Sequence, residues 1–141
     1  MPYFLNYYTS FANKIIVFDN ESTDNTLSIL EDYKNKQREC EIIVETYKTD
    51  GKIRDDVYLD IKNNYWKRWK HECDWIIIVD IDEIIYHPNG LRKYLESLQG
   101  ISLIKSRGYD MFMPDFYQVA NNIQREHPIT PMEICKRGVK N

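Results

Sequence analysis

The stretch DWIIIVDIDE, residues 74–83, is the part of the sequence that decides the fold. Its unbroken apolar run of β-branched residues, 76–79, is typical of a strand buried on both faces of a sheet. Three acids follow this run, namely Asp80, Asp82 and Glu83. Because side chains alternate along a strand, Asp80 and Asp82 are expected on one side, where two carboxylates repel unless a cation lies between them. Their hard oxygens favour Mg²⁺ or Mn²⁺ as that cation.

A second acidic cluster, IIVFDNESTDNT at residues 15–26, also follows an apolar run, and Asp19 ends the strand predicted there. The pattern of apolar residues predicts strands at 14–19, 41–47 and 75–81, one or two more at 101–117, and helices at 2–12, 24–37, 54–71, 89–98 and 131–137. This alternation is typical of an α/β fold, a mainly parallel sheet with helices on both faces. Ligands of such sheets bind at the carboxyl ends of the strands, so both acidic clusters are expected at one edge.

The composition indicates one globular domain over residues 1–141, with 43% hydrophobic and 13% aromatic residues. The net charge of −3 counts against a nucleic-acid partner or an anionic membrane. Three cysteines show no zinc or disulfide spacing, which favours a reducing compartment. With no signal peptide and no apolar run long enough for a transmembrane segment, we expect a cytoplasmic protein.

FDNESTDNT, followed further along the chain by VDIDE, resembles the nucleotide-sugar glycosyltransferases of the Rossmann-like GT-A fold, family 2 and its relatives. The resemblance implies that Asp19 contacts the nucleotide base, with Ser22, Asp24 and Thr26 completing the motif. It also implies that Asp80-Ile81-Asp82 is the DxD motif. In the family this motif holds the metal, Mn²⁺ or Mg²⁺, and the ribose–diphosphate of the donor.

A chain of this family is expected to transfer a sugar from a nucleoside-diphosphate sugar, most simply a UDP-sugar, with inversion. The acceptor is a glycan, a lipid or a protein that the sequence does not identify. Family members have a strand before the helix expected at 2–12, and they continue beyond the end of this chain. The sequence therefore resembles a GT-A domain cut at both ends. We expect it to be poorly stable and inactive unless an upstream strand is restored.

Other residues offer weaker candidates for the donor site. Arg54 and Lys52 follow the turn expected at 49–51. Either side chain could bind a phosphate and offset the charge of a diphosphate. The alternative is that both residues belong to a solvated first turn of the helix. For Ser22, Thr23 and Asp24, capping the helix that follows is the default role, and a ligand contact is the alternative.

The catalytic base is not identified by the sequence. Asp110 and Asp115 are possible general bases, and His127 is a possible third metal ligand, but a structural role is the default for each. Glu83 is either an outer partner of the metal site or a structural hydrogen-bond acceptor.

Two other functions compete with sugar transfer. One is a truncated, non-catalytic module that binds a nucleotide or another protein, which the expected missing strand favours. The other is metal-dependent phosphoryl transfer. Enzymes of that kind usually carry their acidic nucleophile on the first strand, whereas here residues 80–82 lie in the middle of the chain.

Overall fold

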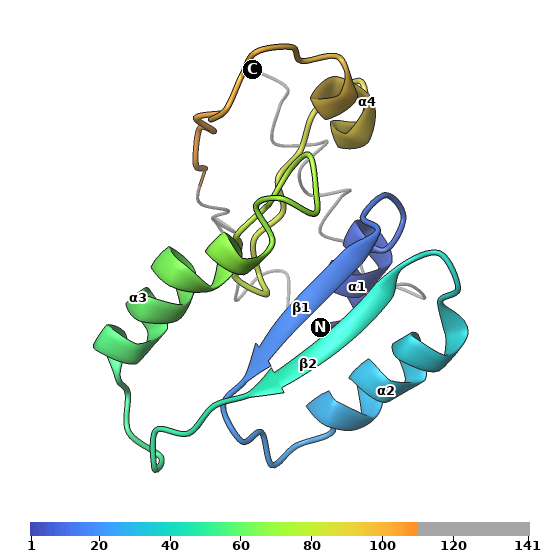
Figure 1. Ribbon diagram of the computed structural model, residues 1–141. Coiled ribbons are helices and arrows are strands. Elements are labelled where there is room, and N and C mark those ends of the chain that lie inside the picture. The colour runs from blue at the N-terminus through green and yellow to red at the C-terminus, as the bar shows by residue number, and fades with distance from the viewer. Residues whose placement is uncertain (110–141) are drawn as a thin grey trace, which may run out of the picture. The chain divides into compact units, whose positions relative to one another are not determined.

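The computed structural model describes residues 1–109, and every structural statement below concerns them. Residues 1–100 form one compact unit; residues 101–109 belong to a second unit and contain no helix or strand. From α1 to α3 the elements of the first unit alternate between helices and strands, as expected for an α/β fold, and two more helices follow (Figure 1). They are α1 (Pro2–Tyr8), β1 (Lys14–Asp19), α2 (Thr26–Lys36), β2 (Glu41–Thr46), α3 (Asp55–Asn64), the 3₁₀ helix η1 (Tyr65–Arg68) and α4 (Leu91–Glu96).

The two strands form a parallel pair, as the sequence predicted. Lys14 lies opposite Glu41 at the start of the sheet, and Asp19 lies opposite Thr46 at its end. The Lys14 ammonium also makes an ion pair with the Glu41 carboxylate at 3.2 Å. Because both strands run in one direction, the loops that follow them leave the sheet at the same edge, near the arrowheads in Figure 1.

Helices pack on both faces of this small sheet. On one face, Leu5 of α1, Leu30 of α2 and Ile42 of β2 form a cluster that is almost completely shielded from solvent. On the other face, the ring of Phe18 meets the ring of Tyr65 edge to face, with 4.5 Å between centroids. These contacts exclude water from the apolar side chains of both strands, which is the main stabilising term in a domain of this size.

The prediction of a central strand at 75–81 is wrong, because residues 75–81 form no strand in the structure. Exposure does alternate along this segment: Ile77 and Val79 pack against a buried cluster around Ile15, whereas Ile76 and Ile78 are 37% and 47% exposed. The segment thus has the side-chain alternation of a strand but is covered on one side only. Within residues 1–109 its backbone also makes no ladder hydrogen bonds with β1.

Helix α1, and not a neighbouring strand, binds the chain that follows this segment. The Tyr7 hydroxyl donates to the carbonyl of Ile85 at 2.7 Å. The Tyr8 hydroxyl donates to the carbonyl of Glu83 at 3.3 Å and accepts the N–H of Ile85 at 3.1 Å. Burial raises the pKa of Tyr8, so its hydroxyl stays protonated and able to donate. Side chains therefore satisfy backbone groups here that a ladder would otherwise pair.

Several helix boundaries differ from the sequence-based expectation. α1 ends at Tyr8, where the hydroxyls of Thr9 and Ser10 bind carbonyls of its last turns, each at 2.6 Å. The helix expected at 54–71 is α-helical only to Asn64 and then tightens into η1, a common way for a helix to end. In α2, the periodic apolar pattern would place Leu27 on the inner face together with Leu30, but Leu27 is 43% exposed, whereas Leu30 is buried.

The strands expected at 101–117 are absent from residues 101–109, and the remainder of that range lies outside the described residues, as does the helix expected at 131–137. Among residues 1–109, no helix combines the length and the apolar composition needed to cross a membrane.

We predict that Tyr8→Phe lowers the free energy of unfolding by about 1–3 kcal/mol, because the N–H of Ile85 loses its partner in a partly buried place. Urea denaturation followed by fluorescence measures this loss. Tyr3→Phe is the matched control, since Tyr3 is 45% exposed, and we expect it to change the free energy by less than about 0.5 kcal/mol. Equal effects of the two substitutions would show that Tyr8 does not hold residues 83–85.

Candidate functional site

The loops after β1 and β2 are joined to each other at the carboxyl edge of the sheet. The Asn20 side-chain amide donates to the Thr49 hydroxyl at 2.8 Å, and that hydroxyl lies 3.2 Å from the Asn20 amide oxygen. The Lys48 ammonium makes an ion pair with the Glu21 carboxylate at 2.6 Å. Thr49 is only 7% exposed, so its hydroxyl depends on Asn20 for a partner. The two loops therefore form one wall beside the strand ends.

Asp19 lies at this edge, where the sequence predicted a contact with the nucleotide base. Its side chain is buried, and one carboxylate oxygen accepts the backbone N–H of Ser22 at 3.1 Å. Its carbonyl accepts the N–H of Tyr47 at 3.0 Å, which continues the pairing of the strands by one step. Asp19 thus holds the start of the first loop through a side-chain bond to the backbone three residues further on.

The helix after this loop begins later than the sequence suggested. α2 starts at Thr26 with Asn25 at the N-cap position, so Ser22 and Thr23 lie in the loop. The Asp24 carboxylate accepts the N–H of Thr26 at 2.9 Å, and hydrogen bonds from Thr26 lower the pKa of Asp24. Asp24 therefore supports the first turn from just outside the helix.

The acids of the DxD motif lie in a tight turn and not on a strand. The Glu83 N–H donates to the carbonyl of Asp80 at 3.0 Å, and the Glu83 carboxylate accepts the N–H of Asp80 at 2.9 Å. Ile81 and Asp82 form the turn between them. The expectation that Asp80 and Asp82 share one side of a strand is therefore wrong, because alternation does not apply in a turn. Glu83 has the structural acceptor role that was one of its two alternatives.

Helix α3 holds the first acid of the motif. The Lys62 ammonium lies 2.8 Å from the Asp80 carboxylate, and the Tyr58 hydroxyl donates to the same oxygen. The hydrogen bonds from Lys62 and Tyr58 lower the pKa of Asp80. Burial lowers the pKa of Lys62. The hydrogen bonds and charge interactions with Asp80 and Tyr58 outweigh this effect and raise the pKa of Lys62 to about 12. Both groups are therefore charged at neutral pH.

The same helical segment is anchored on the sheet beside Asp19. The Tyr65 hydroxyl donates to the Glu45 carboxylate at 2.7 Å, and the Tyr65 ring packs on Phe18. Phe18 and Glu45 lie opposite each other in the register, one step before the strands end. Tyr65 therefore anchors η1 on the sheet, and α3, which leads directly into η1, holds Asp80 through Lys62. The separation between Asp19 and Asp82 themselves stays a prediction.

The remaining predicted site residues are exposed. Asp82 has no ion pair with any other described residue. The Arg54 guanidinium makes two hydrogen bonds to Asp56, at 2.8 and 2.6 Å, and these lower the pKa of Asp56 to about 2. Lys52 is exposed and has no ion pair within residues 1–109. A phosphate would thus compete with Asp56 for Arg54, whereas Lys52 needs no such exchange.

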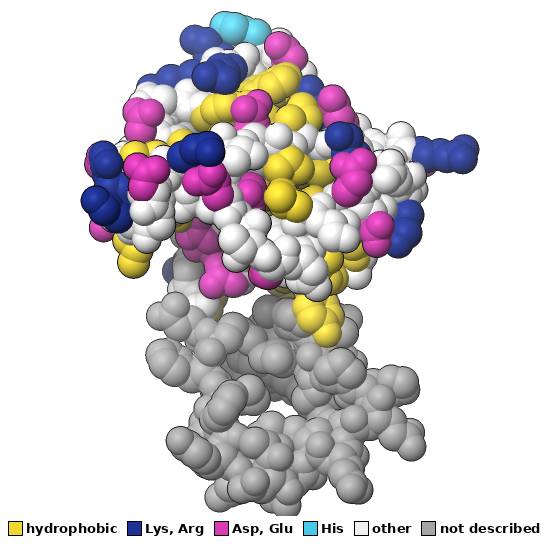
Figure 2. Space-filling model, turned by 90° about the horizontal axis from the view of Figure 1, so that it is seen from below, with side chains coloured by type: hydrophobic (Ala, Val, Ile, Leu, Met, Phe, Trp, Pro, Cys, Tyr) yellow, Lys and Arg dark blue, Asp and Glu magenta, His cyan; other side chains and the backbone are white. Residues whose placement is uncertain are grey.

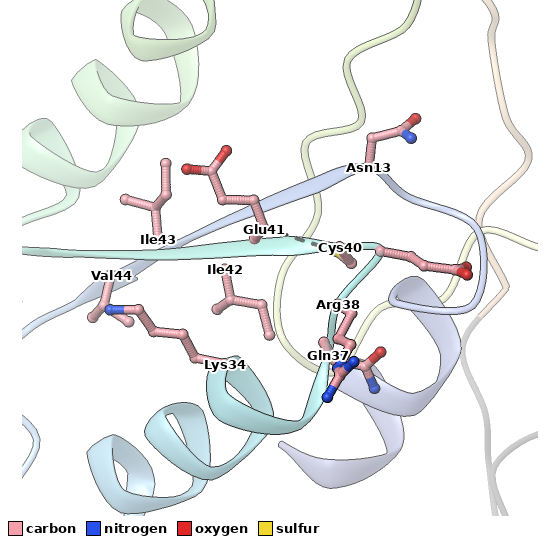
Figure 3. Close-up of a pocket in the computed structure, with 10 residues that line it drawn as sticks. Asn13, Lys34, Gln37, Arg38, Cys40, Glu41, Ile42, Ile43 and Val44 are labelled. Atoms are coloured by element: carbon pink, nitrogen blue, oxygen red, sulfur yellow. Dashed lines mark hydrogen bonds between the residues drawn. The ribbon is translucent and has the colours of Figure 1, made fainter.

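A groove of about 510 Å³ lies at the other end of the strands, along the start of β2 (Figure 3). Asn13, which precedes β1, and Lys34 and Arg38, which flank the end of α2, contribute to its lining. Its position at the amino ends of the strands separates it from Asp19 and Thr46. It is therefore not part of the site built at the carboxyl edge.

Charged side chains are mixed in sign on the face that Figure 2 shows, with apolar side chains between them. A surface that binds nucleic acid gathers cations into one patch or stripe. The part of the surface visible in Figure 2 gathers neither sign over a wide area.

Comparison with known proteins shows what kind of chain carries this arrangement. The model of the family described as glycosyltransferase family 92 matches residues 3–135, which is nearly the whole chain. The chain belongs to glycosyltransferase family 92. No curated protein and no solved structure matches it significantly.

Membership of glycosyltransferase family 92 confirms the predicted glycosyltransferase class and indicates sugar transfer. The finer likeness to family 2 and the GT-A fold stays a prediction. The small parallel sheet with helices on both faces is compatible with that fold.

The family 92 chain offers two carboxylates at its DxD turn, Asp80 and Asp82. Within residues 1–109, no group of three or more His, Cys, Asp or Glu side chains could enclose a metal ion. Two carboxylates still fit Mg²⁺ or Mn²⁺, because such ions are commonly bound by one or two protein carboxylates together with water and substrate phosphates. His127, Asp110 and Asp115, the other candidates, lie outside the described residues.

Sequence reasoning missed Tyr58 and Lys62 as neighbours of the DxD turn. Apolar residues recur every four positions along this helical segment, at 57, 61, 65 and 69, and all four residues of this stripe are half-buried. Tyr58 and Lys62 each follow a stripe residue and lie four positions apart, so they occupy the border of the buried face. An aromatic hydroxyl and a cation that lie together on the border of a buried helix face are the sequence signal that could have indicated a partner for an acidic turn.

We predict that Thr49→Val lowers the free energy of unfolding by about 0.5–1.5 kcal/mol, because it removes the hydroxyl that joins the two loops while keeping the shape. Thermal or urea unfolding measures the change. Thr23→Val is the control, since Thr23 is exposed in the first loop. A loss no larger than that of Thr23→Val would mean that the loops are not coupled through Asn20 and Thr49.

Proposed function

We propose that residues 1–141 are a GT-A type glycosyltransferase domain that binds a nucleoside-diphosphate sugar, most simply a UDP-sugar. It transfers the sugar to a glycan, lipid or protein acceptor. One observation carries the proposal. In a chain of glycosyltransferase family 92, an acidic DxD turn is held by helix α3, and η1, which directly follows α3, packs on Phe18, the residue before Asp19 at the carboxyl edge of a parallel sheet.

Each part of the edge has a role in this proposal. The loops joined by Asn20 and Thr49 form the wall for the nucleoside, and Asp19 shapes that wall. Asp80 and Asp82 hold Mn²⁺ or Mg²⁺, which when bound neutralises the diphosphate and stabilises it as a leaving group. Arg54 lies at the start of α3, where its guanidinium can exchange Asp56 for a phosphate oxygen.

We predict that Mn²⁺ strengthens UDP binding about tenfold or more in the unmodified chain and that Asp82→Asn removes this enhancement. The substitution keeps the shape of the side chain but deletes the charge that attracts the cation. Calorimetric titration with UDP, with and without Mn²⁺, measures the effect for both proteins. Asp74→Asn is the matched control, because Asp74 is an exposed acid of the same segment.

Equal UDP affinities in all four conditions would rule out the metal role of the DxD turn. Loss of the enhancement in Asp74→Asn as well would show that the effect reflects net charge and not the turn.

Transfer itself separates the proposed enzyme from its alternatives. Mn²⁺-dependent release of UDP from at least one UDP-sugar when acceptor sugars are supplied, measured by a coupled UDP assay, would favour the enzyme. UDP binding without any UDP release would favour a non-catalytic nucleotide-binding module. Release of phosphate from a phosphomonoester would favour phosphoryl transfer.

A further inference from the structure

The DxD turn already has a cation beside it, supplied by the protein. The Lys62 ammonium lies 2.8 Å from one oxygen of the Asp80 carboxylate, and the Tyr58 hydroxyl donates to that same oxygen. The ammonium also lies 4.5 Å from the centre of the Tyr58 ring, a cation–π distance. Tyr58 therefore positions Lys62 from one side while Asp80 binds it from the other.

We propose that Lys62 is a tethered counter-cation of the DxD turn, which a divalent metal must displace from Asp80 before the donor can bind. The inference rests on the proposed function, because it takes Asp80 to be a metal ligand. It goes further by stating that metal binding and release of Lys62 are one event.

The charges require this exchange. A Mg²⁺ or Mn²⁺ ion bound to Asp80 lies at about 2 Å from a carboxylate oxygen. An ammonium that remained on the same carboxylate would face the doubly charged ion within a few ångströms and be repelled. The ion pair is also only partly shielded, since the side chains of Lys62 and Asp80 are 29% and 40% exposed. Lys62 can therefore leave for solvent on its flexible stem.

The exchange gives Lys62 an effect opposite to that of a supporting residue. A residue that builds a metal site weakens metal binding when it is removed. A tethered cation competes with the metal, so its removal strengthens metal binding while the fold is kept. The direction of the change in metal affinity thus distinguishes the two roles.

We expect Lys62→Met to bind Mn²⁺ about fivefold more tightly than the unmodified chain, the change expected for loss of one partly exposed ion pair. Lys62→Gln should behave in the same way, and Lys62→Arg, which keeps the cation, should bind as the unmodified chain does. Isothermal calorimetry with Mn²⁺ alone, without nucleotide, measures the affinities. Lys70→Met is the control for net charge, because Lys70 is exposed and has no ion pair within the described residues.

A second readout follows Lys62 directly. We expect Mg²⁺ to increase acetylation of Lys62 by an amine-reactive reagent, measured by mass spectrometry, with labelling of Lys70 unchanged. This experiment reports on the exchange in the unmodified chain, so it holds even if a Lys62 variant folds poorly.

Each outcome decides one claim. The role of Lys62 is overturned if Lys62→Met and Lys62→Gln bind Mn²⁺ no more tightly than the unmodified chain. It is also overturned if Lys62→Met and Lys70→Met gain equally in Mn²⁺ affinity. Either result leaves the metal site intact. Absence of Mn²⁺ binding in every variant would overturn the metal assignment of the proposed function, and this inference with it.

Discussion

The parallel pairing of β1 and β2 is the constraint on which the rest of the structure depends. Its register puts Asp19 opposite Thr46, so both following loops must leave the sheet at one edge. Only because of that coincidence can Asn20 meet Thr49 and Lys48 meet Glu21. An antiparallel pair would have sent the loops to opposite ends and left their polar groups to water.

The second constraint is electrostatic and concerns the acidic turn. Asp80 carries its charge beside helix α3, with its side chain 40% exposed. Lys62 and Tyr58, both on α3, bind that carboxylate. The turn thus has a cation from the protein beside it, and α3 supplies that cation. Helix α3 in turn is fixed by the contact of Tyr65 with Phe18 and Glu45.

Local patterns were sufficient to predict much of this arrangement. The β-branched runs identified β1 and β2, and periodic apolar residues identified the buried faces of α1 and α3. The prediction of a strand at 75–81 was wrong. A β-branched run indicates an extended chain with a buried side, whereas a strand also requires a backbone partner. In the described chain, hydroxyls of Tyr7 and Tyr8 supply hydrogen bonds next to this segment.

Side-chain partners of the site could not be predicted in the same way. The phosphate role of Arg54 stays a prediction, and a carboxylate two residues away, which the sequence analysis did not pair with it, accepts two of its N–H donors. The pairing of Lys62 with Asp80 joins residues 18 positions apart, as their numbers show, and depends on how α3 packs. Periodicity defines which face of a helix is buried; it does not define which segment lies beside the border of that face.

The bonds from Tyr7 and Tyr8 also have a consequence for how the chain reaches its folded state. They join residues separated by 75 to 78 positions, so they can form only after almost the whole described unit has been synthesised and closed into one loop. Contacts of such long range carry the largest entropic cost of closure and slow folding. The stretch just after the acidic turn is therefore expected to be ordered late, after the strands and α2 have assembled.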